Sequence, residues 1–459
     1  MAVARSDESR VVSLRASAGN AIARAKALLA DGSDNSLARR MAGTAFLIRV
    51  FGAGVMYLSH ILLARWMSSF EFGVYVYVWT WLVLVGGLAP LGIAYSAQRF
   101  IPEYGAAKDL DRLRGFLTGS RFLSFGLGAA AAALGLALIL VFGDRIAPYY
   151  FVPFLLALAC IPLFTLSSAQ DGIARSFNWI HIALVPSFVA QPLVILAIVA
   201  VCYAAGVPAV AVTAMAATAA AIWITVILQA VLLQRRLARE VASGPRRYET
   251  THWFRTALPI FLVDGFYFLL TYTDILVLQL FVDPSEIGIY YAATKTLVLI
   301  SFIYYAVSAA FAHRFSEAHF AGRRDQLEAF ISEAVRWTFW PSLAMAAVLL
   351  VLGKWILMLF GAGFADGYPL LFVLTMGLLA RASVGPAERL LIMVGEQGVC
   401  AAIYATAFTV NLVLCFALVA WLGLIGAAIS TATALTVESV LLFVMARRRL
   451  GLYIFFWRR

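Results

Sequence analysis

Six charged side chains lie inside long apolar stretches of this 459-residue sequence. A charge at the centre of a membrane costs at least about 2.5–3.5 kcal/mol on the insertion scale, so each needs a partner, water or a function. An arginine or lysine at such a position could bind an anion, and a carboxylate could bind a cation. The six residues are Arg49, Asp264, Asp274, Lys295, Arg381 and Glu438.

The charges of these residues predict two roles. We expect Arg49, Lys295 and Arg381 to contact an anionic group of a substrate. Asp264 or Asp274 would then hold a coupling cation such as H⁺ or Na⁺. Six deep charges in one chain favour a hydrated cavity inside the membrane.

A structural alternative for these residues stays open, because opposite charges can neutralise each other in pairs that fix helix register. Arg49 and Asp264 lie at equivalent depths in two related spans, so a pair between them is geometrically plausible. Asp274 and Lys295 both lie in the outer half of their spans and could also pair. Glu438 lies in an inner half and is expected either to pair or to bind a coupling cation.

Arg99 and Arg314 occupy matched positions at the inner ends of two spans, each followed by phenylalanine. Boundary arginines usually anchor helices by extending to the membrane surface. The alternative is a two-armed phosphate clamp, because the guanidinium fork matches phosphate oxygens. Two acid–arginine pairs at other inner ends are interpreted as boundary anchors: Asp171 with Arg175, and Glu388 with Arg389.

The elements that position these residues are predicted to be membrane-spanning helices. Hydrophobic residues make up 63% of the sequence and charged residues 13%, and about 20 apolar residues are enough to cross a bilayer. The apolar runs are continuous rather than alternating, which excludes an outer-membrane barrel. Twelve spans are expected, at residues 41–64, 73–97, 120–143, 151–171, 179–203, 208–234, 256–281, 287–312, 334–360, 367–390, 397–420 and 424–446.

The chain repeats itself at a shift of 215 positions, where residues 42–106 align without a gap with residues 257–321. EIGIYYAATKTLVLI falls on EFGVYVYVWTWLVLV and aligns Glu, Gly and Tyr in one register. The sequence therefore predicts an all-α membrane protein built as two parallel six-helix lobes. The lobes are expected at 41–234 and 256–446, with a linker at 235–255 and basic tails at 1–40 and 447–459.

Lysine and arginine gather in alternate connections, and this asymmetry predicts that both termini are cytoplasmic. It also accounts for the net charge of +11, so no nucleic-acid partner is expected. The basic segments are the tail to Arg40, residues 99–121, 235–255, 314–336 and 447–459, with Arg65, Arg145 and Lys354 as exceptions.

Several classes of function are disfavoured by what the sequence lacks. No connection is long enough for an extramembrane catalytic domain, which argues against a membrane glycosyltransferase or polymerase and against an enzyme in general. No glycine-rich phosphate loop is present. The histidines and the four cysteines form no metal motif, so no cofactor or metal is expected.

With these spans and charges, the chain resembles the polysaccharide, or O-antigen, flippases of the multidrug/oligosaccharidyl-lipid/polysaccharide (MOP) exporter superfamily. The matching pieces are LLARWMSSFEFGVYVY, QRFIPEYGAAKDLDRLRGFL, WFRTALPIFL, DILVLQLFVDPSEIGIYYAATKTLVLI and LGLIGAAISTATAL. The resemblance covers roughly residues 41–446. It implies two lobes around a central cavity that opens alternately to each side of the bacterial inner membrane.

The cargo implied by the resemblance is a polyprenyl-diphosphate-linked oligosaccharide, with membrane lipids and polysaccharide polymerase or export machinery as partners. The acidic residues leave a cation-coupled multidrug or metabolite exporter of the same superfamily as the alternative. A non-transporting member of an export complex also stays open. A major-facilitator protein shares the twelve-span plan, but GAAKDLDRLRG replaces that family's tight loop after the second span.

Overall fold

The computed structural model describes residues 34–456, and within that range the chain is helical without a strand. Twelve helices there are long and apolar enough to cross a membrane, which confirms the predicted number of spans. The first half contains α2 (Asp34–Trp66), α3 (Ser69–Leu88), α4 (Ile93–Ala106), α5 (Leu110–Phe142), α6 (Pro148–Ser176), α7 (Ile180–Val185), α8 (Gln191–Ala204) and α9 (Ala211–Glu240).

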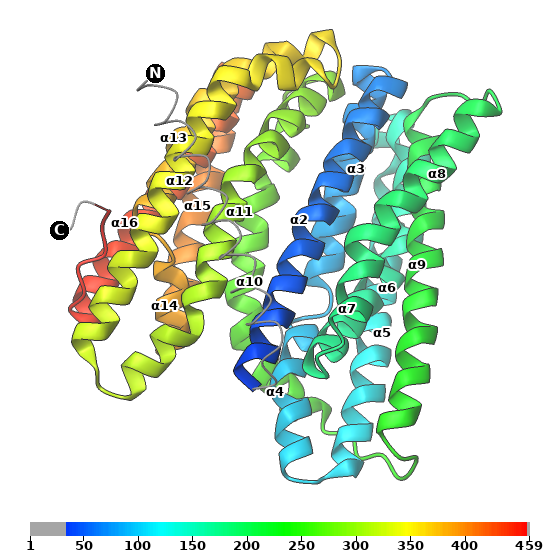
Figure 1. The fold of residues 1–459 in the computed structure, drawn as a ribbon. Helices are drawn as coiled ribbons and strands as arrows, with labels where there is room; N and C mark the ends of the chain where they lie inside the picture. Colours follow the sequence, from blue (N-terminus) through cyan, green and yellow to red (C-terminus); the bar gives the residue numbers. More distant parts are fainter. Residues whose placement is uncertain (1–33, 457–459) are drawn as a thin grey trace, which may run out of the picture.

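The second half contains seven further α-helices and follows the same plan. They are α10 (Thr250–Leu278), α11 (Pro284–Phe320), α12 (Arg324–Met358), α13 (Tyr368–Ser383), α14 (Ala387–Met393), α15 (Gln397–Leu422) and α16 (Leu424–Leu450). Figure 1 shows α2 to α9 as one group and α10 to α16 as another, and α10 and α11 of the second group pack against α3 of the first. We call the two groups the first and second lobes.

The second predicted span is interrupted, and this break distinguishes the halves. Pro90 ends α3, and Gly92 with φ +80° starts α4. A Cβ on Gly92 would overlap the Ala257 carbonyl and Phe261, so glycine also lets α10 approach closely. The repeat-equivalent α11 runs unbroken for 37 residues. The repeat thus fixes the number of spans but not the shape of each one.

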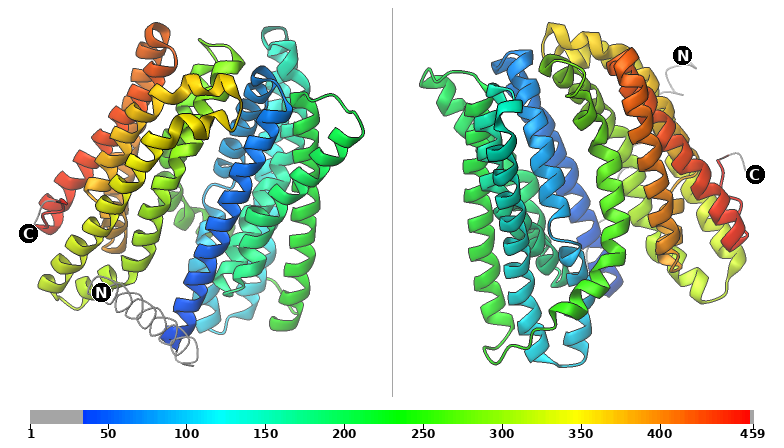
Figure 2. Two further views of the ribbon diagram at one scale, coloured as in Figure 1. Left: turned by 45° about the horizontal axis from the view of Figure 1, so that its top comes forward. Right: turned by 180° about the vertical axis from the view of Figure 1, so that it is seen from behind.

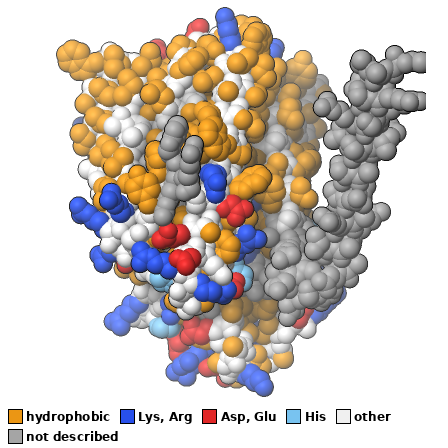
Figure 3. Space-filling model, turned by 60° about the vertical axis from the view of Figure 1, so that its left-hand side comes forward, with side chains coloured by type: hydrophobic (Ala, Val, Ile, Leu, Met, Phe, Trp, Pro, Cys, Tyr) orange, Lys and Arg blue, Asp and Glu red, His pale blue; other side chains and the backbone are white. Residues whose placement is uncertain are grey.

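The surface has the character of a lipid-facing one. Phe122 is 74% exposed and Trp421 87% exposed, which is costly in water but favourable against hydrocarbon. On the face drawn in Figure 3, hydrophobic side chains cover the upper part and charged side chains gather toward the lower end. We call this lower end the basic end, because the arginine-rich connections between α4 and α5, α9 and α10, and α11 and α12 lie there.

The two lobes share one core at the end opposite the basic end. Phe72 from the first lobe packs there against Phe364 and Tyr291 of the second, with ring centroids 5.8 and 6.2 Å away. Arg65 donates hydrogen bonds to the carbonyls of Met358 (3.0 Å) and Leu359 (2.7 Å) across the same junction. Toward the basic end, the buried apolar residues divide into two separate clusters, one in each lobe, and the first also includes Trp253 near the start of α10. The lobes are therefore sealed together at one end and diverge toward the other, as the two views in Figure 2 also show.

Candidate functional site

A cavity of about 730 Å³ lies between the lobes, within the range of small-molecule sites. Its walls come from α2, α3, α4, α6, α9, the segment Pro186–Ala190 and the start of α8 in the first lobe, and from α10 and α11 in the second. Aromatic rings supply much of the lining, including Trp79, Tyr95, Phe164, Phe188 and Phe268. The shared core closes the cavity at the end opposite the basic end.

Lys295 is the second lobe's charge in this cavity. It lies on α11, and its ammonium group stands 4.8 Å from the ring centroid of Tyr291 and 5.7 Å from that of Tyr272. Cation–π attraction of this kind is worth about 0.5–2 kcal/mol. Among the described residues, no carboxylate oxygen lies within 4 Å of the ammonium group. Asp274 acts on this ammonium group electrostatically from beyond salt-bridge distance, so the cavity holds a positive charge that no direct ion pair occupies.

Two hydrogen bonds join the lobes beside Lys295. His60 Nδ1 lies 2.9 Å from the Met56 carbonyl, which can only accept, so Nδ1 carries the proton. His60 Nε2 then accepts from the Tyr291 hydroxyl at 3.1 Å. Thr296 donates to the Ala292 carbonyl, so the Tyr57 hydroxyl donates to Thr296 Oγ1 at 2.8 Å. Both contacts connect α2 to α11.

A polar network forms the wall of the cavity on α6. Asp171 accepts from Gln229 Nε2 at 2.8 Å and pairs with Arg175 at 3.3 Å. Gln229 also accepts from Ser167 at 3.1 Å and donates to the Ile182 carbonyl at 3.0 Å. Ser167 lies 3.3 Å from Ser187 Oγ. These residues bring hydroxyl, amide, carboxylate and guanidinium groups together on one side of the cavity.

The sequence interpretation of Asp171 and Arg175 as boundary anchors missed their position in this wall. A signal was present in the polar stripe of Ser167, Ser168, Asp171, Gly172 and Arg175. Neighbouring members are one or three residues apart and alternate members four, so they share one helix face. A polar stripe on a membrane-spanning helix needs an aqueous or polar neighbour. In this protein that neighbour is the cavity.

Arg49 lies near this wall, but the predicted pair with Asp264 does not form. Its guanidinium group stands 5.9 Å from the ring centroid of Phe188, and the side chain is exposed. Within residues 43–456, neither Arg49 nor Asp264 has an ion-pair partner within 4 Å. Val50 lines the cavity while Arg49 stands beside it. Equal depth along two helices did not bring the two side chains to facing positions.

Asp274 and Lys295 also do not form the ion pair that the sequence suggested. Asp274 is 3% exposed and accepts three hydrogen bonds instead. The donors are the Ile275 amide at 2.8 Å, the Tyr290 hydroxyl at 2.7 Å and the Thr431 hydroxyl at 3.2 Å. Asp274 therefore ties α10, α11 and α16 together inside the second lobe and does not line the cavity.

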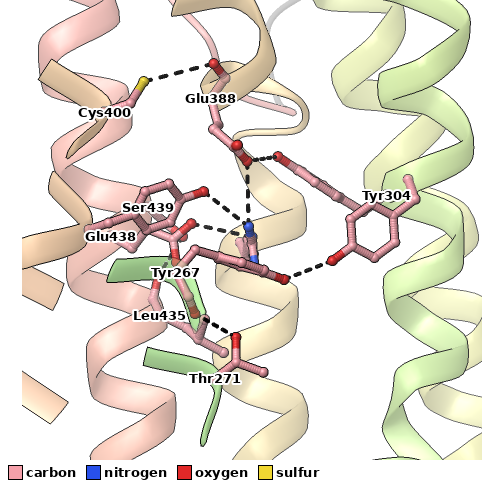
Figure 4. Close-up of polar contacts among 11 residues, drawn as sticks. Tyr267, Thr271, Tyr304, Glu388, Cys400, Leu435, Glu438 and Ser439 are labelled. Atoms are coloured by element: carbon pink, nitrogen blue, oxygen red, sulfur yellow. Dashed lines mark hydrogen bonds and ion pairs between the residues drawn. The ribbon is translucent and has the colours of Figure 1, made fainter. Parts of the chain in front are cut away.

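Arg381 lies in a buried charge cluster of the second lobe, drawn in Figure 4. Its guanidinium group is 3.3 Å from Glu438 Oε1 and 3.6 Å from Glu388 Oε2. Tyr304 donates to Glu388 at 2.9 Å, and Arg381 donates to the Tyr404 hydroxyl at 3.4 Å. Arg381 borders only a small void of about 20 Å³ and not the large cavity. Two carboxylates pair with Arg381, which lies apart from the cavity in which we expect an anionic group of the substrate.

Arg99 and Arg314 do not line the large cavity either. Arg99 pairs with Glu103 at 3.7 Å, and its side chain is 62% exposed. The Arg314 guanidinium group stands 5.4 and 5.6 Å from the ring centroids of Phe311 and Phe330. An exposed pair and ring contacts are the surroundings that anchoring arginines have at a membrane surface.

Residues 40–319 match the family described as polysaccharide biosynthesis protein. No curated protein sequence matches the chain. An inward-facing multidrug resistance MATE family transporter of the MOP superfamily is similar in structure, with a TM-score of 0.70 and 18% identity, covering 89% of this chain and 94% of that chain.

Two further structures share this fold. An outward-facing MATE family transporter of the MOP superfamily has a TM-score of 0.68 and 17% identity, covering 90% of this chain and 95% of that chain. A MOP superfamily transporter from Pyrococcus furiosus, described as having a binding pocket of reverse polarity that suggests a different function, has a TM-score of 0.66 and 15% identity, covering 90% and 95%. The chain is thus a multi-pass membrane protein with a MATE-like fold, and it belongs to the polysaccharide biosynthesis protein family.

Proposed function

We propose that this protein is a transporter that moves a polyprenyl-diphosphate-linked oligosaccharide across the bacterial inner membrane by alternating access. The observation that carries the proposal is the aromatic-lined cavity of about 730 Å³ between the lobes, in which Lys295 forms no direct salt bridge with the described residues. Sugars and diphosphate cannot cross hydrocarbon unaided, so they need a polar chamber with positive charge. The family match supports a cargo of polysaccharide synthesis.

The edge of the cavity suits the lipid part of such a cargo. Val50 on α2 and Val298 and Leu299 on α11 line the cavity with exposed apolar side chains. A prenyl chain could remain in the bilayer between α2 and α11 while the sugars occupy the cavity. The basic end faces the cytoplasm in this proposal, so the divergent lobes receive the cargo where it is made.

The charge cluster of the second lobe is our candidate for cation coupling. Arg381 supplies one positive charge for two carboxylates, and Glu438 is fully buried with neither oxygen hydrogen-bonded within the described chain. One proton or Na⁺ ion would complete the charge balance. Asp264 is half-buried and unpaired within residues 43–456, so it is a second candidate.

Translocation of a fluorescent lipid-linked oligosaccharide in proteoliposomes tests the proposed function. Losing a hydrogen bond to a charged group costs about 1.5–3 kcal/mol, so Lys295→Ala should lower the rate about 10- to 100-fold. Lys295→Arg should retain part of the rate. Lys354→Ala is the matched control, because Lys354 is exposed on α12 away from the cavity. Unchanged translocation by Lys295→Ala would refute the proposed anion site.

The alternative is a cation-coupled multidrug or metabolite exporter. Asp171 and the aromatic walls of the cavity favour it, because both can attract an organic cation. Removing the Lys295 charge should then raise export of an organic cation instead of lowering transport. Measuring both cargoes with the same Lys295→Ala protein separates the two functions by the sign of the effect.

A further inference from the structure

We propose that the first lobe binds the phosphate of an anionic phospholipid at the basic end, between Arg121 on α5 and Arg246 of the segment that joins α9 to α10. We call this segment, residues 241–249, the linker segment. Neither arginine lines the cavity between the lobes, and the inference does not depend on the proposed cargo. It follows from two positive charges that are held near each other at the membrane boundary without a carboxylate partner.

The linker segment lies at the basic end (Figure 1) and is fixed against the start of α5. The Arg247 amide donates to the Asp111 carbonyl at 2.9 Å, and Arg114 donates to a backbone carbonyl of the linker segment at 2.6 Å. A Cβ on Gly115 would overlap the Arg247 carbonyl, so glycine lets the two backbones approach closely. Arg246 directly precedes this anchored residue, and its backbone is therefore held beside α5.

Arg121 is fixed from the other side of the proposed site. Its Nε donates to the Leu117 carbonyl at 3.0 Å, and one terminal nitrogen donates to Gln234 Oε1 on α9 at 3.0 Å. A guanidinium group has five N–H donors. Because these two bonds use two donors, three remain for a ligand. The side chain is half-buried, so its position is set before any ligand binds.

The charges at this position favour an anion. Among the described residues, the charged group that acts on Arg121 is Arg246, which is also positive. No described carboxylate lies within 4 Å of either guanidinium group, because the acids of the adjoining segments, Asp111 and Glu249, pair with other arginines. A phosphate between the two groups would remove their repulsion and accept hydrogen bonds from both. A headgroup with its own ammonium group would add a third positive charge.

The height of Arg121 along α5 assigns this phosphate to a lipid. Arg145 ends the same candidate span, 24 residues further along the chain, which corresponds to about 36 Å in a helix. The hydrocarbon core is about 30 Å thick, so the two arginines stand at its opposite boundaries. Phe122 and Phe125 are 74% and 41% exposed beside Arg121. Acyl chains can lie along these rings while the phosphate stays at the level of the guanidinium groups.

A lipid at this site would hold three parts of the chain together. These are α5, the end of α9 through Gln234, and the linker segment. The linker segment leads directly into α10, where Trp253 is fully buried among first-lobe residues and donates to the Tyr104 hydroxyl at 3.2 Å. The bound lipid would therefore stabilise the junction from which the chain enters the second lobe.

The experiment measures lipid binding to the full-length protein by native mass spectrometry. The probes are phosphatidylglycerol and phosphatidylethanolamine with the same acyl chains, and the variants are Arg121→Gln and Arg246→Gln. Arg145→Gln is the matched control, because it removes the same charge from an exposed position at the other end of the span. The ratio of the two lipids is measured on each preparation, so differences in folding cancel. Soluble glycerol 3-phosphate is added as a competitor to separate a lipid headgroup from a free phosphate.

We expect the unmodified protein to prefer phosphatidylglycerol, and Arg121→Gln and Arg246→Gln each to weaken its binding about 10-fold or more. Arg145→Gln should leave the preference unchanged. Arg121→Lys should bind less tightly than the unmodified protein although its charge is kept, because an ammonium group lacks the planar fork. The same loss in all three glutamine variants would mean that general surface charge attracts the lipid, and would overturn the site. Displacement of the lipid by equimolar glycerol 3-phosphate, or no preference in the unmodified protein, would also overturn it.

Discussion

The most informative perturbation is the removal of Arg381 from its buried cluster. Arg381 is the single positive charge between Glu388 and Glu438, and the three side chains are 13%, 16% and 0% exposed. Arg381→Met keeps most of the volume and removes the charge. Two carboxylates then face each other in the second lobe without a cation. Glu438→Gln is the matched control, because it removes one of the two negative charges and leaves the pair between Arg381 and Glu388.

The expected magnitudes differ because of this charge count. Breaking a buried ion pair by removing one partner costs about 3–5 kcal/mol, since the remaining charge is uncompensated. Arg381→Met should therefore lower the ratio of folded to unfolded protein about a hundred- to a few thousand-fold. Glu438→Gln should change the free energy of unfolding by less than about 1 kcal/mol, because Glu438 accepts no hydrogen bond and the amide needs no counter-charge. The variant with Arg381→Met, Glu388→Gln and Glu438→Gln together should recover most of the loss.

Unfolding of the purified protein in detergent, followed by tryptophan fluorescence, measures these differences. The predicted order of stability is unmodified protein and Glu438→Gln together, then the triple variant, then Arg381→Met. If Glu438→Gln is as unstable as Arg381→Met, then Glu438 itself stabilises the lobe, and the balance of charges does not. If Arg381→Met has the stability of the unmodified protein but does not translocate the cargo, Arg381 contacts the substrate.

Three further outcomes follow from single contacts. Gln229→Leu should cost about 1–3 kcal/mol of folding stability, because two buried acceptors lose their donor. Gln170→Leu should be neutral or stabilising, because that buried amide has no partner within the described chain. Thermal unfolding compares the two variants, and equal losses of stability would contradict the reasoning. Gly73→Val should disrupt the contact that closes the cavity between the lobes, because a Cβ there would overlap a backbone carbonyl of the other lobe. Gly105→Ala is the control, because a Cβ at that position meets open space. Labelling of an engineered cavity cysteine from the outer side should rise in Gly73→Val and not in Gly105→Ala. His60→Ala removes a hydrogen bond between the lobes and should cost about 0.5–1.5 kcal/mol in the same unfolding assay, and an unchanged midpoint would show that this bond is replaced by water.

The sequence predicted the membrane class, the twelve spans and the resemblance to a family, and the structure and the family match confirm these. These features are local, because an apolar stretch of about 20 residues forms its own backbone hydrogen bonds and crosses the bilayer whatever its neighbours are. The sequence also singled out Lys295, because a charge within such a stretch is visible without any knowledge of packing. The interruption at Pro90 and Gly92 carried a recognisable signal of the same local kind.

The partners of the charged residues were decided by the tertiary structure alone. The repeat placed Arg49 and Asp264 at equal depth, yet depth does not fix which way each helix is rotated about its axis. Rotation and tilt follow from the packing of whole helix faces, so Arg49 came to lie on Phe188 beside the wall of Asp171 and Arg175. The same packing placed two carboxylates in salt-bridge contact with Arg381 and none in such contact with Lys295. Contacts between distant helices depend on geometry that no single stretch of sequence contains.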